Sequence, residues 1–504
     1  MTTIRTIGVV GAGTMGRGIA QLFAQAGHTV QCYDAIDGAA ERGVSAVRAT
    51  IDRLLEKGKL EAGAADTIKA AIRICTRLDE LAGCDLVIEA IVEDLAVKRE
   101  LFRALEDIVG ESTILASNTS SLVISELAAG CRHPQRIAGL HFFNPVPLMK
   151  VAEVIAGVRT APATVASLKA CVEGAGHRAV VAADQPGFLV NHAGRGLYTE
   201  GLRVLEEQVA LPHEVDTLMR EAAGFRMGPF ELLDLTGLDV SGKVMESIYQ
   251  QFHQEPRFRP SSLVAPRIAA GLLGRKTGDG WYHYVDGSRH EAPRTAPPPM
   301  PTGPRIWIEP AAAQRAGLAN LCEQAGAVVV SEDQAADVLI VQPWGADATS
   351  YCARQGLDAQ RAVAVDPAPG LQRHRSLMIT SVTQAKVRDT AHALLAADGT
   401  PVTVINDSPG FVVQRIVATI VNIAANIVQR GIASVDDLED AVRLGLGYPL
   451  GPLALGDSLG ASRILEVLSG MHALTGDPRY RPSPWLRRRA VLGLSLLTPE
   501  AARA

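Results

Sequence analysis

The sequence predicts a doubly wound α/β domain followed by an all-α domain, and then a degenerate α/β unit followed by a second all-α domain. Two observations predict this order. In residues 1–185, short β-branched runs alternate with amphipathic helical stretches, which is typical of a parallel sheet covered by helices. In addition, three sequence blocks from the first half of the chain recur in the second half at nearly constant spacing.

The strands of the first domain are expected where short apolar runs end at turn residues. These runs are residues 6–10, 29–33, 86–89, 113–116 and 137–141. From Gly187 to about Gln254 the pattern changes to long helices, and residues 195–207 place leucines at helical spacing. Residues 291–304 are rich in proline, which indicates a stiff and exposed linker.

The repeated blocks indicate an internal duplication. The run PGFLV at 186–190 recurs as PGFVV at 409–413; GPF at 228–230, followed by Asp234 and Gly237, recurs as GPL at 451–453, followed by Asp457 and Gly460; and PRFRP at 256–260 recurs as PRYRP at 478–482. We therefore expect an α/β domain over 1–185, a helical domain over 186–290, a linker over 291–304, a degenerate α/β unit over 305–408 and a second helical domain over 409–504.

The composition excludes several classes of protein. A net charge of −5 over 504 residues gives no reason to expect a nucleic-acid or anionic-membrane partner. The sequence shows neither a charged leader with an apolar stretch nor an apolar run long enough to span a bilayer. The seven cysteines form no Cys-x-x-Cys pair, so we expect reduced thiols, a cytoplasmic location and no metal site.

A glycine loop follows the first expected strand and precedes a helix expected over 17–26. It consists of Gly11, Ala12, Gly13, Thr14, Met15 and Gly16. Its first glycine permits a tight turn, its second lets the backbone approach a pyrophosphate at the helix N-terminus, and its third allows close packing of helix on strand. Asp34 ends the second strand, where a carboxylate accepts bonds from ribose hydroxyls and repels the extra phosphate of NADP. The loop and Asp34 predict a site for NAD.

His141 lies at the end of an expected parallel strand, at the sheet edge where α/β proteins bind ligands. A lone histidine is more often structural, but Glu153 follows twelve residues later in an apolar run. A neutral histidine can remove the proton of an alcohol near pH 7, and a carboxylate on its other nitrogen stabilises the imidazolium that forms. His141 is therefore a candidate general base for the oxidation of an alcohol.

Six motifs make the sequence resemble the 3-hydroxyacyl-CoA dehydrogenase family over residues 1–290. They are GAGTMG at 11–16, EAIVED at 89–94, ASNTSS at 116–121, HFFNPVP at 141–147, DQPGFLVN at 184–191 and GRKTGDG at 274–280. The resemblance implies a Rossmann-type NAD-binding domain and the oxidation of a short-chain (S)-3-hydroxyacyl-CoA. With its second helical domain, the chain resembles the long bacterial members of the phenylacetate-degradation type, which act on 3-hydroxyadipyl-CoA, 3-hydroxybutyryl-CoA and similar acyl-CoAs.

The resemblance also implies roles for individual residues. It makes His141 the general base, oriented by Glu153. It assigns Ser120 and Asn191 to the substrate hydroxyl and thioester oxygen and to the nicotinamide ribose, and it places Glu93, Lys98, Asn144 and Lys276 around NAD. Lys57 falls where the family has a lysine on a CoA phosphate, although a solvated helix end explains this residue as well.

The second half lacks the glycine loop and the HFFN motif, and Gln414 stands at the position that matches Asn191. We therefore expect no cofactor and no catalysis there. Single-copy relatives pair their helical domains between subunits, so we expect residues 409–504 to pack against 187–290 of the same chain, whether or not the protein forms a homodimer. Two other functions stay open: a hydroxy-acid dehydrogenase of the gulonate type, and a non-catalytic NAD-binding protein.

Overall fold

The computed structural model describes residues 4–290 and 296–501, and the chain divides into two compact units. Unit 1 contains residues 1–192 together with 430–446, and unit 2 contains residues 193–429 together with 447–504. Residues 291–295 of the expected linker lie outside the described residues. A short segment of the second helical repeat thus belongs to the same unit as the N-terminal domain.

Unit 1 is built on an eight-stranded sheet with the order β3-β2-β1-β4-β5-β6-β7-β8. Its strands are β1 (Thr6–Val10), β2 (Thr29–Tyr33), β3 (Ile72–Ile74), β4 (Leu86–Glu89), β5 (Ile114–Ser117), β6 (Ile137–Phe142), β7 (Val151–Ala156) and β8 (Arg178–Ala183). Neighbouring strands are parallel except that β7 runs antiparallel to β6. The carboxyl ends of β1, β4, β5 and β6 therefore meet at one edge of the sheet.

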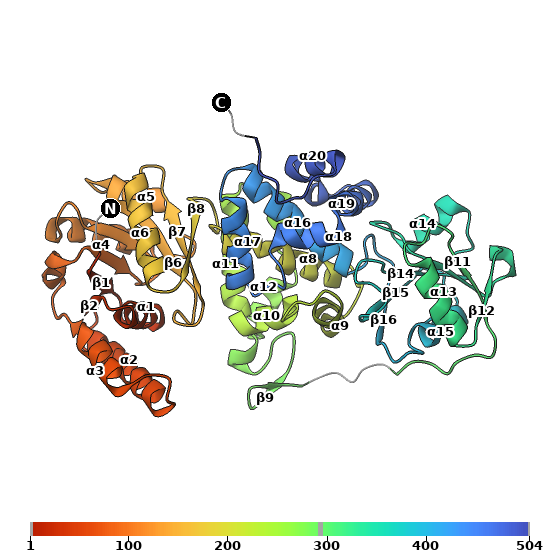
Figure 1. Ribbon diagram of the computed structural model, residues 1–504, viewed down its shortest axis with the longest axis horizontal. Coiled ribbons are helices and arrows are strands. Elements are labelled where there is room, and N and C mark those ends of the chain that lie inside the picture. The colour runs from red at the N-terminus through yellow and green to blue at the C-terminus, as the bar shows by residue number, and fades with distance from the viewer. Residues whose placement is uncertain (1–3, 291–295, 502–504) are drawn as a thin grey trace. The chain divides into compact units, whose positions relative to one another are not determined.

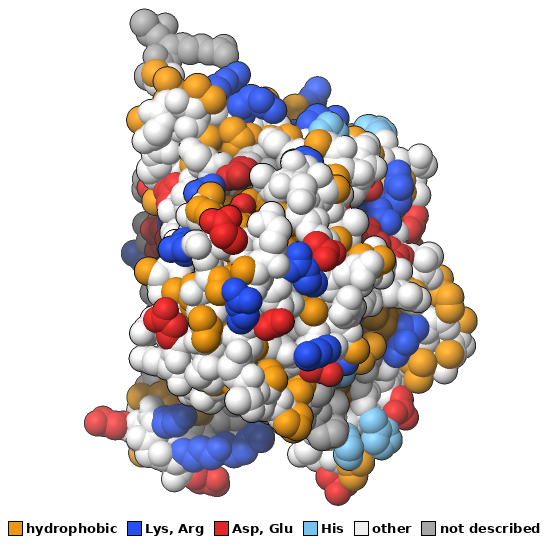
Figure 2. All heavy atoms as spheres, turned by 90° about the vertical axis from the view of Figure 1, so that its right-hand side faces the viewer, with side chains coloured by type: hydrophobic (Ala, Val, Ile, Leu, Met, Phe, Trp, Pro, Cys, Tyr) orange, Lys and Arg blue, Asp and Glu red, His pale blue; other side chains and the backbone are white. Residues whose placement is uncertain are grey.

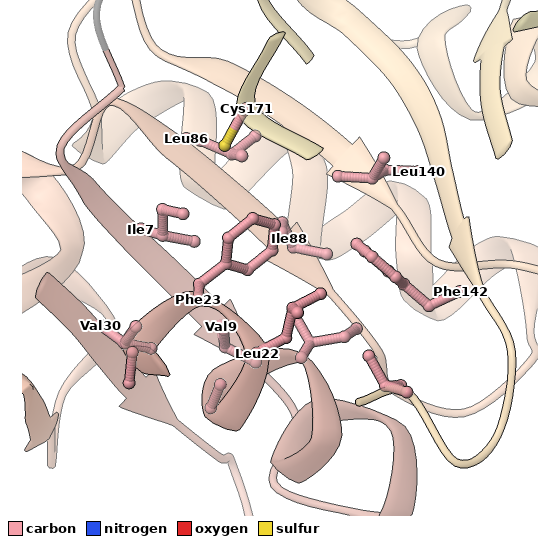
Figure 3. Close-up of a cluster of buried hydrophobic side chains, with 14 of the residues drawn as sticks. Ile7, Val9, Leu22, Phe23, Val30, Leu86, Ile88, Leu140, Phe142 and Cys171 are labelled. Carbon is pink, nitrogen blue, oxygen red and sulfur yellow. The ribbon is translucent and has the colours of Figure 1, made fainter. Parts of the chain in front are cut away.

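The helices of unit 1 bury their apolar faces against this sheet. They are α1 (Thr14–Gln25), α2 (Ala39–Glu56), α3 (Ala62–Ala71), α4 (Leu95–Ile108), α5 (Ile124–Ala128), α6 (Pro162–Gly174), α7 (Val190–Ala193) and, from the second repeat, α17 (Val435–Gly445). Figure 3 shows Phe23 of α1 among Ile7, Ile88 and Leu140 of three strands. This core fixes α1 directly behind the glycine loop.

In unit 2, the first helical repeat contributes α8 (Arg195–Glu206), α9 (Pro212–Thr217), α10 (Pro229–Thr236), α11 (Leu238–Gln251), α12 (Val264–Ala269) and the hairpin β9 (Tyr284–Val285) and β10 (Ser288–Arg289). The second repeat contributes α16 (Val413–Gln429), α18 (Pro452–Leu459), α19 (Ala461–Thr475) and α20 (Pro484–Leu492). Helix α16 packs along α8, as Figure 1 shows.

A buried ion pair joins the two helical repeats within unit 2. The guanidinium Nε of Arg415 on α16 lies 2.5 Å from Oε1 of Glu200 on α8, and both side chains are completely buried. Tyr480 donates its hydroxyl to the same carboxylate oxygen at 2.8 Å. Burying two charges is tolerated only when they are paired and hydrogen-bonded, so the two repeats depend on each other at this contact.

The second α/β unit, also in unit 2, has a six-stranded sheet with the order β12-β11-β13-β14-β15-β16. Its elements are β11 (Arg305–Ile308), α13 (Arg315–Gln324), β12 (Val328–Val330), β13 (Val338–Val341), α14 (Ala348–Gln355), β14 (Ala362–Val365), β15 (Arg375–Ile379), α15 (Ala385–Leu395) and β16 (Val402–Ile405). Strand β15 is antiparallel to β14, as β7 is to β6. The unit therefore repeats the first sheet without counterparts of β3 and β5. Basic and acidic side chains are interspersed on the face in Figure 2.

The predicted fold class matches this architecture, with small shifts at element ends. The fourth expected strand (113–116) lies one residue further along as β5, and the helix expected over 17–26 begins already at Thr14. The earlier start arises because the glycine loop itself forms the helix N-terminus, with Gly13 as the capping residue. Within residues 4–290 and 296–501, none of the helices combines the length and the apolar character needed to cross a bilayer.

Candidate active site

The glycine loop between β1 and α1 has a distinct steric requirement at each glycine. Gly11 has a φ of +101°, and a Cβ there would lie 2.6 Å from the carbonyl oxygen of Ala90. A Cβ on Gly16 would lie 1.8 Å from the carbonyl oxygen of Gly11, so helix and loop can approach only with glycine. At Gly13 nothing lies within 4 Å of such a Cβ, which leaves open space beside the amides at the start of α1. A helix N-terminus with open space beside it is suited to a phosphate group.

Asp34 follows β2 and reaches this loop. Its Oδ2 accepts the Ala12 amide at 2.7 Å, and its Oδ1 accepts the Ile36 amide at 2.9 Å. The carboxylate is therefore held at the carboxyl end of β2, beside the glycine loop. This is the position from which an acidic residue contacts the adenosine ribose in dinucleotide-binding folds.

A chain of charged groups lies beneath the carboxyl ends of β4 and β5. The ammonium Nζ of Lys98 on α4 lies 2.8 Å from Oε2 of Glu89, which ends β4, and 3.4 Å from Oε2 of Glu93. Lys98 and Glu89 are almost completely buried. Glu89 begins the EAIVED motif, but no role was predicted for it; an acidic residue at the end of an otherwise apolar strand was the available signal.

Glu93 connects these charged groups to the loop after β5. Its Oε1 accepts the Thr119 hydroxyl at 2.6 Å and the Ser120 amide at 3.0 Å. Burial alone would raise the pKa of the Glu93 carboxyl, but the bond from Thr119 and the charge of Lys98 lower it below its usual value. An ionised Glu93 thus fixes the backbone that presents Ser120.

His141 and Glu153 face each other across the antiparallel pair of β6 and β7. The ring nitrogen Nδ1 of His141 lies 2.6 Å from Oε2 of Glu153, and both side chains are buried. Oε1 of Glu153 accepts the amides of Leu189 and Val190 at 2.9 and 2.8 Å. With Nδ1 donating to the carboxylate, the tautomer assigned to His141 leaves the lone pair on Nε2.

Ser120 and His141 lie at the same edge of the sheet. Strands β5 and β6 are parallel neighbours, with Ser117 opposite Gly139. Ser120 follows Ser117 by three residues, and His141 follows Gly139 by two. The Phe142 amide donates to Oδ1 of Asn118 at 2.9 Å, which ties the two strand ends together. Asn191 lies in α7, directly after the Val190 amide that Glu153 accepts. The structure therefore brings Ser120, His141, Glu153 and the start of α7 to one region of unit 1.

Of the three other candidate residues, two belong to unit 1 and one belongs to the other unit. Lys57 is exposed at the C-terminal end of α2, and Asn144 is exposed after β6. Lys276 belongs to unit 2, where its Nζ lies 2.5 Å from Oδ1 of Asp239.

A cavity of about 290 Å³ lies between α1, α2 and the loop after β6. Arg17 of α1 and Arg53 of α2 line it together with Asn144. Arg53 stands one helical turn before Lys57, so α2 presents two basic groups on one face. Neither arginine was predicted as a site residue, although for Arg53 the four-residue spacing from Lys57 was a visible signal.

The second sheet holds different residues at the positions of the catalytic candidates. In the first sheet His141 lies opposite Glu153, and Glu153 lies opposite Val180. In the second sheet the Asp366 amide donates to the Ser376 carbonyl, and Ser376 lies opposite Thr403. Thr403 precedes the second PGF motif by the same number of residues as Val180 precedes the first. Asp366 and Ser376 therefore occupy the places of His141 and Glu153.

Gln414, which matches Asn191 in the repeat, hydrogen-bonds to the residues at this position of the second sheet. Its Nε2 donates to Oδ1 of Asp366 at 2.9 Å, and its Oε1 accepts the Gly345 amide at 3.0 Å. Burial raises the pKa of the Asp366 carboxyl to about 6, against the lowering effect of its hydrogen bonds. A neighbouring cavity of about 570 Å³ is lined by Glu309 at the place of Gly11, directly after the first strand of the sheet.

Comparison with known proteins gives matches along most of the chain. The family model "3-hydroxyacyl-CoA dehydrogenase, NAD binding domain" matches residues 6–185, and the model of the C-terminal domain matches residues 187–284 and 410–495. The chain is 37% identical over 493 residues, 98% of each protein, to 3-hydroxyadipyl-CoA dehydrogenase of Escherichia coli (strain K12). It is 41% identical over 283 residues to a probable 3-hydroxybutyryl-CoA dehydrogenase of Bacillus subtilis (strain 168), covering 56% of this chain and 98% of that protein.

Among solved structures, the chain is similar to 3-hydroxybutyryl-CoA dehydrogenase from Escherichia coli K12. The two superpose with a TM-score of 0.87 at 36% sequence identity, and the match covers 97% of this chain and 99% of the other. The likeness therefore includes both halves of the duplication.

Proposed function

Since the chain belongs to the 3-hydroxyacyl-CoA dehydrogenase family, we propose that it oxidises a short-chain (S)-3-hydroxyacyl-CoA to the 3-oxoacyl-CoA with His141 as general base. The observation that carries the proposal is the 2.6 Å contact between Nδ1 of His141 and Oε2 of Glu153. It leaves Nε2 as the proton acceptor at the ligand-binding edge of the sheet. We also propose a cytoplasmic location, which the free thiols of all seven cysteines support.

Oxidation of a secondary alcohol removes a proton from the hydroxyl oxygen and a hydride from the carbon that bears this hydroxyl. NAD supplies the hydride acceptor when it is bound. Nε2 of His141 takes the hydroxyl proton, and the Glu153 carboxylate stabilises the imidazolium that results. Because Glu153 is also held by the Leu189 and Val190 amides, it cannot turn away as the charge on His141 changes.

The glycine loop and Asp34 would hold the pyrophosphate and the adenosine ribose of NAD. Lys98 is buried on Glu89 and Glu93, so we propose that it acts on the cofactor site through Glu93 rather than by direct contact. Ser120 and Asn191 would bind the substrate hydroxyl and thioester oxygen. The remaining candidates, Asn144 and Lys276, stay proposals for contacts to NAD.

The basic groups of Arg17, Arg53 and Lys57 support recognition of a CoA phosphate. Two of them line the cavity of about 290 Å³, and the third lies one turn further along α2. Guanidinium and ammonium groups are the side chains that bind phosphates in proteins. We propose that the nucleotide part of CoA lies along this face of α2.

The function is tested by NADH formation with purified full-length protein. We expect turnover with 3-hydroxybutyryl-CoA or 3-hydroxyadipyl-CoA and none with L-gulonate. The ratio of kcat/KM for these two CoA esters decides which acyl group is preferred. Turnover of L-gulonate alone would replace the proposal with the gulonate type, and NAD binding without any turnover would make the chain a binding protein.

Replacing His141 by glutamine tests the base directly. Gln keeps a polar group of similar size but cannot take a proton, so kcat should fall by ~10²–10⁴-fold while NADH binding is unchanged. Glu153→Gln should give a smaller loss in kcat and a shifted pH profile, because the orienting charge is lost. Steady-state kinetics and NADH fluorescence titration measure both. A His141→Gln enzyme within threefold of wild type would remove His141 from this role.

A further inference from the structure

The two halves of the chain exchange a segment with each other. The segment that follows α16, residues 430–446, belongs to unit 1, where α17 packs against β7 and β8. In unit 2, the equivalent part of the first repeat, residues 208–222, contacts β15 and the residues that directly precede β15 and follow β16. Each helical repeat thus supports the sheet that precedes the other repeat.

Two matching backbone hydrogen bonds show that the exchange is symmetric. In unit 1 the Ala183 amide at the end of β8 donates to the Ile432 carbonyl at 2.8 Å. In unit 2 the Asn406 amide just after β16 donates to the Val209 carbonyl at 2.9 Å. Ala183 and Asn406 stand the same distance before their PGF motifs, as Val209 and Ile432 stand the same distance after them. The contacts are therefore equivalent by sequence and by geometry.

In unit 1, ion pairs strengthen the contact between β8 and the segment 430–446. Arg178, the first residue of β8, places Nη2 2.8 Å from Oδ1 of Asp437 and Nε 2.8 Å from Oδ2 of Asp440. Both acidic residues lie on α17, and all three side chains are partly buried. The edge strand of the catalytic sheet is thereby covered by a helix from the other half of the chain.

The end of α17 lies against the side chains of two residues that neighbour the proposed catalytic carboxylate in the structure. A Cβ built on Gly445 would lie 3.1 Å from Cγ2 of Val190 and 3.5 Å from Cγ1 of Val151. The Val190 amide is one of the two that Glu153 accepts, and Val151 lies two residues before Glu153 on β7. Gly445 is therefore adjacent to Val190, and the amide of Val190 binds Glu153, which orients His141.

We propose that residues 430–446 of the second half are a positioning element for Glu153 and His141, so that the second helical repeat influences turnover at the site in unit 1. This inference rests on the proposed function. Gly445 allows α17 to approach Val190 closely, and the ion pairs of Arg178 hold the helix in that place. Asn191 follows Val190, so the same contact also sets the start of α7.

The variant Gly445→Ala tests the proposal, because its methyl group would displace Val190 by a few tenths of an ångström. We expect kcat to fall by about 3–10-fold, since misplacements well below 1 Å already reduce rates. KM for NAD and for acyl-CoA should stay within twofold, and the acidic limb of the pH profile of kcat should shift. Adding Val190→Ala makes room for the methyl group and should restore both kcat and the pH profile.

A matched pair of variants separates positioning from general stability. Asp437→Asn with Asp440→Asn loosens α17 on the catalytic sheet, whereas Glu221→Gln loosens the equivalent segment, where Glu221 lies 2.9 Å from His374. We expect a lower kcat for the first variant only, with similar changes in thermal midpoint for both. Wild-type kinetics for Gly445→Ala, or equal losses in both loosened variants, would overturn the proposal. Because wild-type and His141→Gln enzymes are assayed alongside, a failure of the proposed function itself would appear as an inactive wild type.

Discussion

Glu153 is the residue on which the geometry of the dyad depends. One of its oxygens accepts from His141, and the other accepts the Leu189 and Val190 amides. A completely buried carboxylate that accepts from three donors is held in one rotamer. The sequence indicated His141 and Glu153 as a pair by their position in apolar strands, but the amides could not be predicted because they belong to a turn far along the chain.

Asp34 offers a prediction on the choice of cofactor. Its charge should disfavour the 2′-phosphate of NADP, so wild-type kcat/KM should be at least about 100-fold higher for NAD than for NADP. Asp34→Asn keeps an oxygen to accept the Ala12 amide but removes the charge. We expect this variant to narrow the ratio by about tenfold, measured by steady-state kinetics with both cofactors. Equal use of NAD and NADP by the wild type would contradict the role of Asp34.

Asp366 gives a prediction on pH and stability. Burial raises its folded-state pKa to about 6 from an ordinary 3.8. A raised pKa favours the protonated form, so stability from this group is present below pH 3.8 and is lost as pH rises through 6. The loss amounts to up to about 3 kcal/mol. Asp366→Asn should therefore raise the thermal midpoint more at pH 8 than at pH 5, and an equal change at both pH values would contradict this sign.

At the scale of the element, apolar runs located β1, β2, β4, β5 and β6, because burial leaves little freedom in the sequence of these strands. The strands β3, β7 and β8 were not among the expected ones. The strands expected over 6–10, 29–33 and 86–89 have these bounds in the structure. The placement of α17 could not be predicted. Its amphipathic pattern requires an apolar partner without saying which, and that partner lies more than 240 residues earlier in the sequence.

Helix α2 carries the prediction on CoA. Arg53→Ala and Lys57→Ala should each raise KM for acyl-CoA by about 3–10-fold with little change in kcat, because a phosphate far from the reacting carbon contributes binding only. Lys59→Ala is the matched control, since Lys59 is also exposed but lies two residues past Lys57, the capping residue of α2. The effect should vanish with an N-acetylcysteamine thioester, which has no phosphate. Unchanged KM values in both variants would place CoA elsewhere.

At the scale of the whole molecule, the duplication provides within one chain what shorter relatives are expected to obtain from a second subunit. Helix α16 covers α8 in unit 2, and α17 covers β8 in unit 1. The three repeated blocks predicted that the two helical repeats pack against each other, as α16 and α8 do. They could not predict the Arg415–Glu200 pair, because neither residue belongs to a repeated functional motif. The second half has therefore kept its packing surfaces while its site has been filled by Asp366, Ser376 and Gln414.

Truncation at about residue 290 tests this interpretation. The fragment keeps Ser120, His141, Glu153 and Asn191 but loses α16 and α17, so the apolar face of α8 and the edge of β8 become exposed. Exposed apolar area costs ~25 cal/mol per Å². Glu200 would also lose the partner of a buried ion pair, at about 3–5 kcal/mol. A second copy of the fragment can cover the exposed apolar face and the edge of β8 with the equivalent segments of its own first repeat, although it carries His192 at the position of Arg415 and so does not restore the ion pair.

We therefore expect the fragment to dimerise or to aggregate, as sedimentation or light scattering would show. Its activity per subunit should rise with protein concentration, since only the dimer covers β8 and holds Glu153 in place. Arg415→Ala in the full chain is the matched comparison: it weakens the same helical contact without removing α17, so it should lower the thermal midpoint while turnover per subunit stays independent of concentration. A fragment that is monomeric, as heat-stable as the full chain and equally active at every concentration would show that the second half is an independent module.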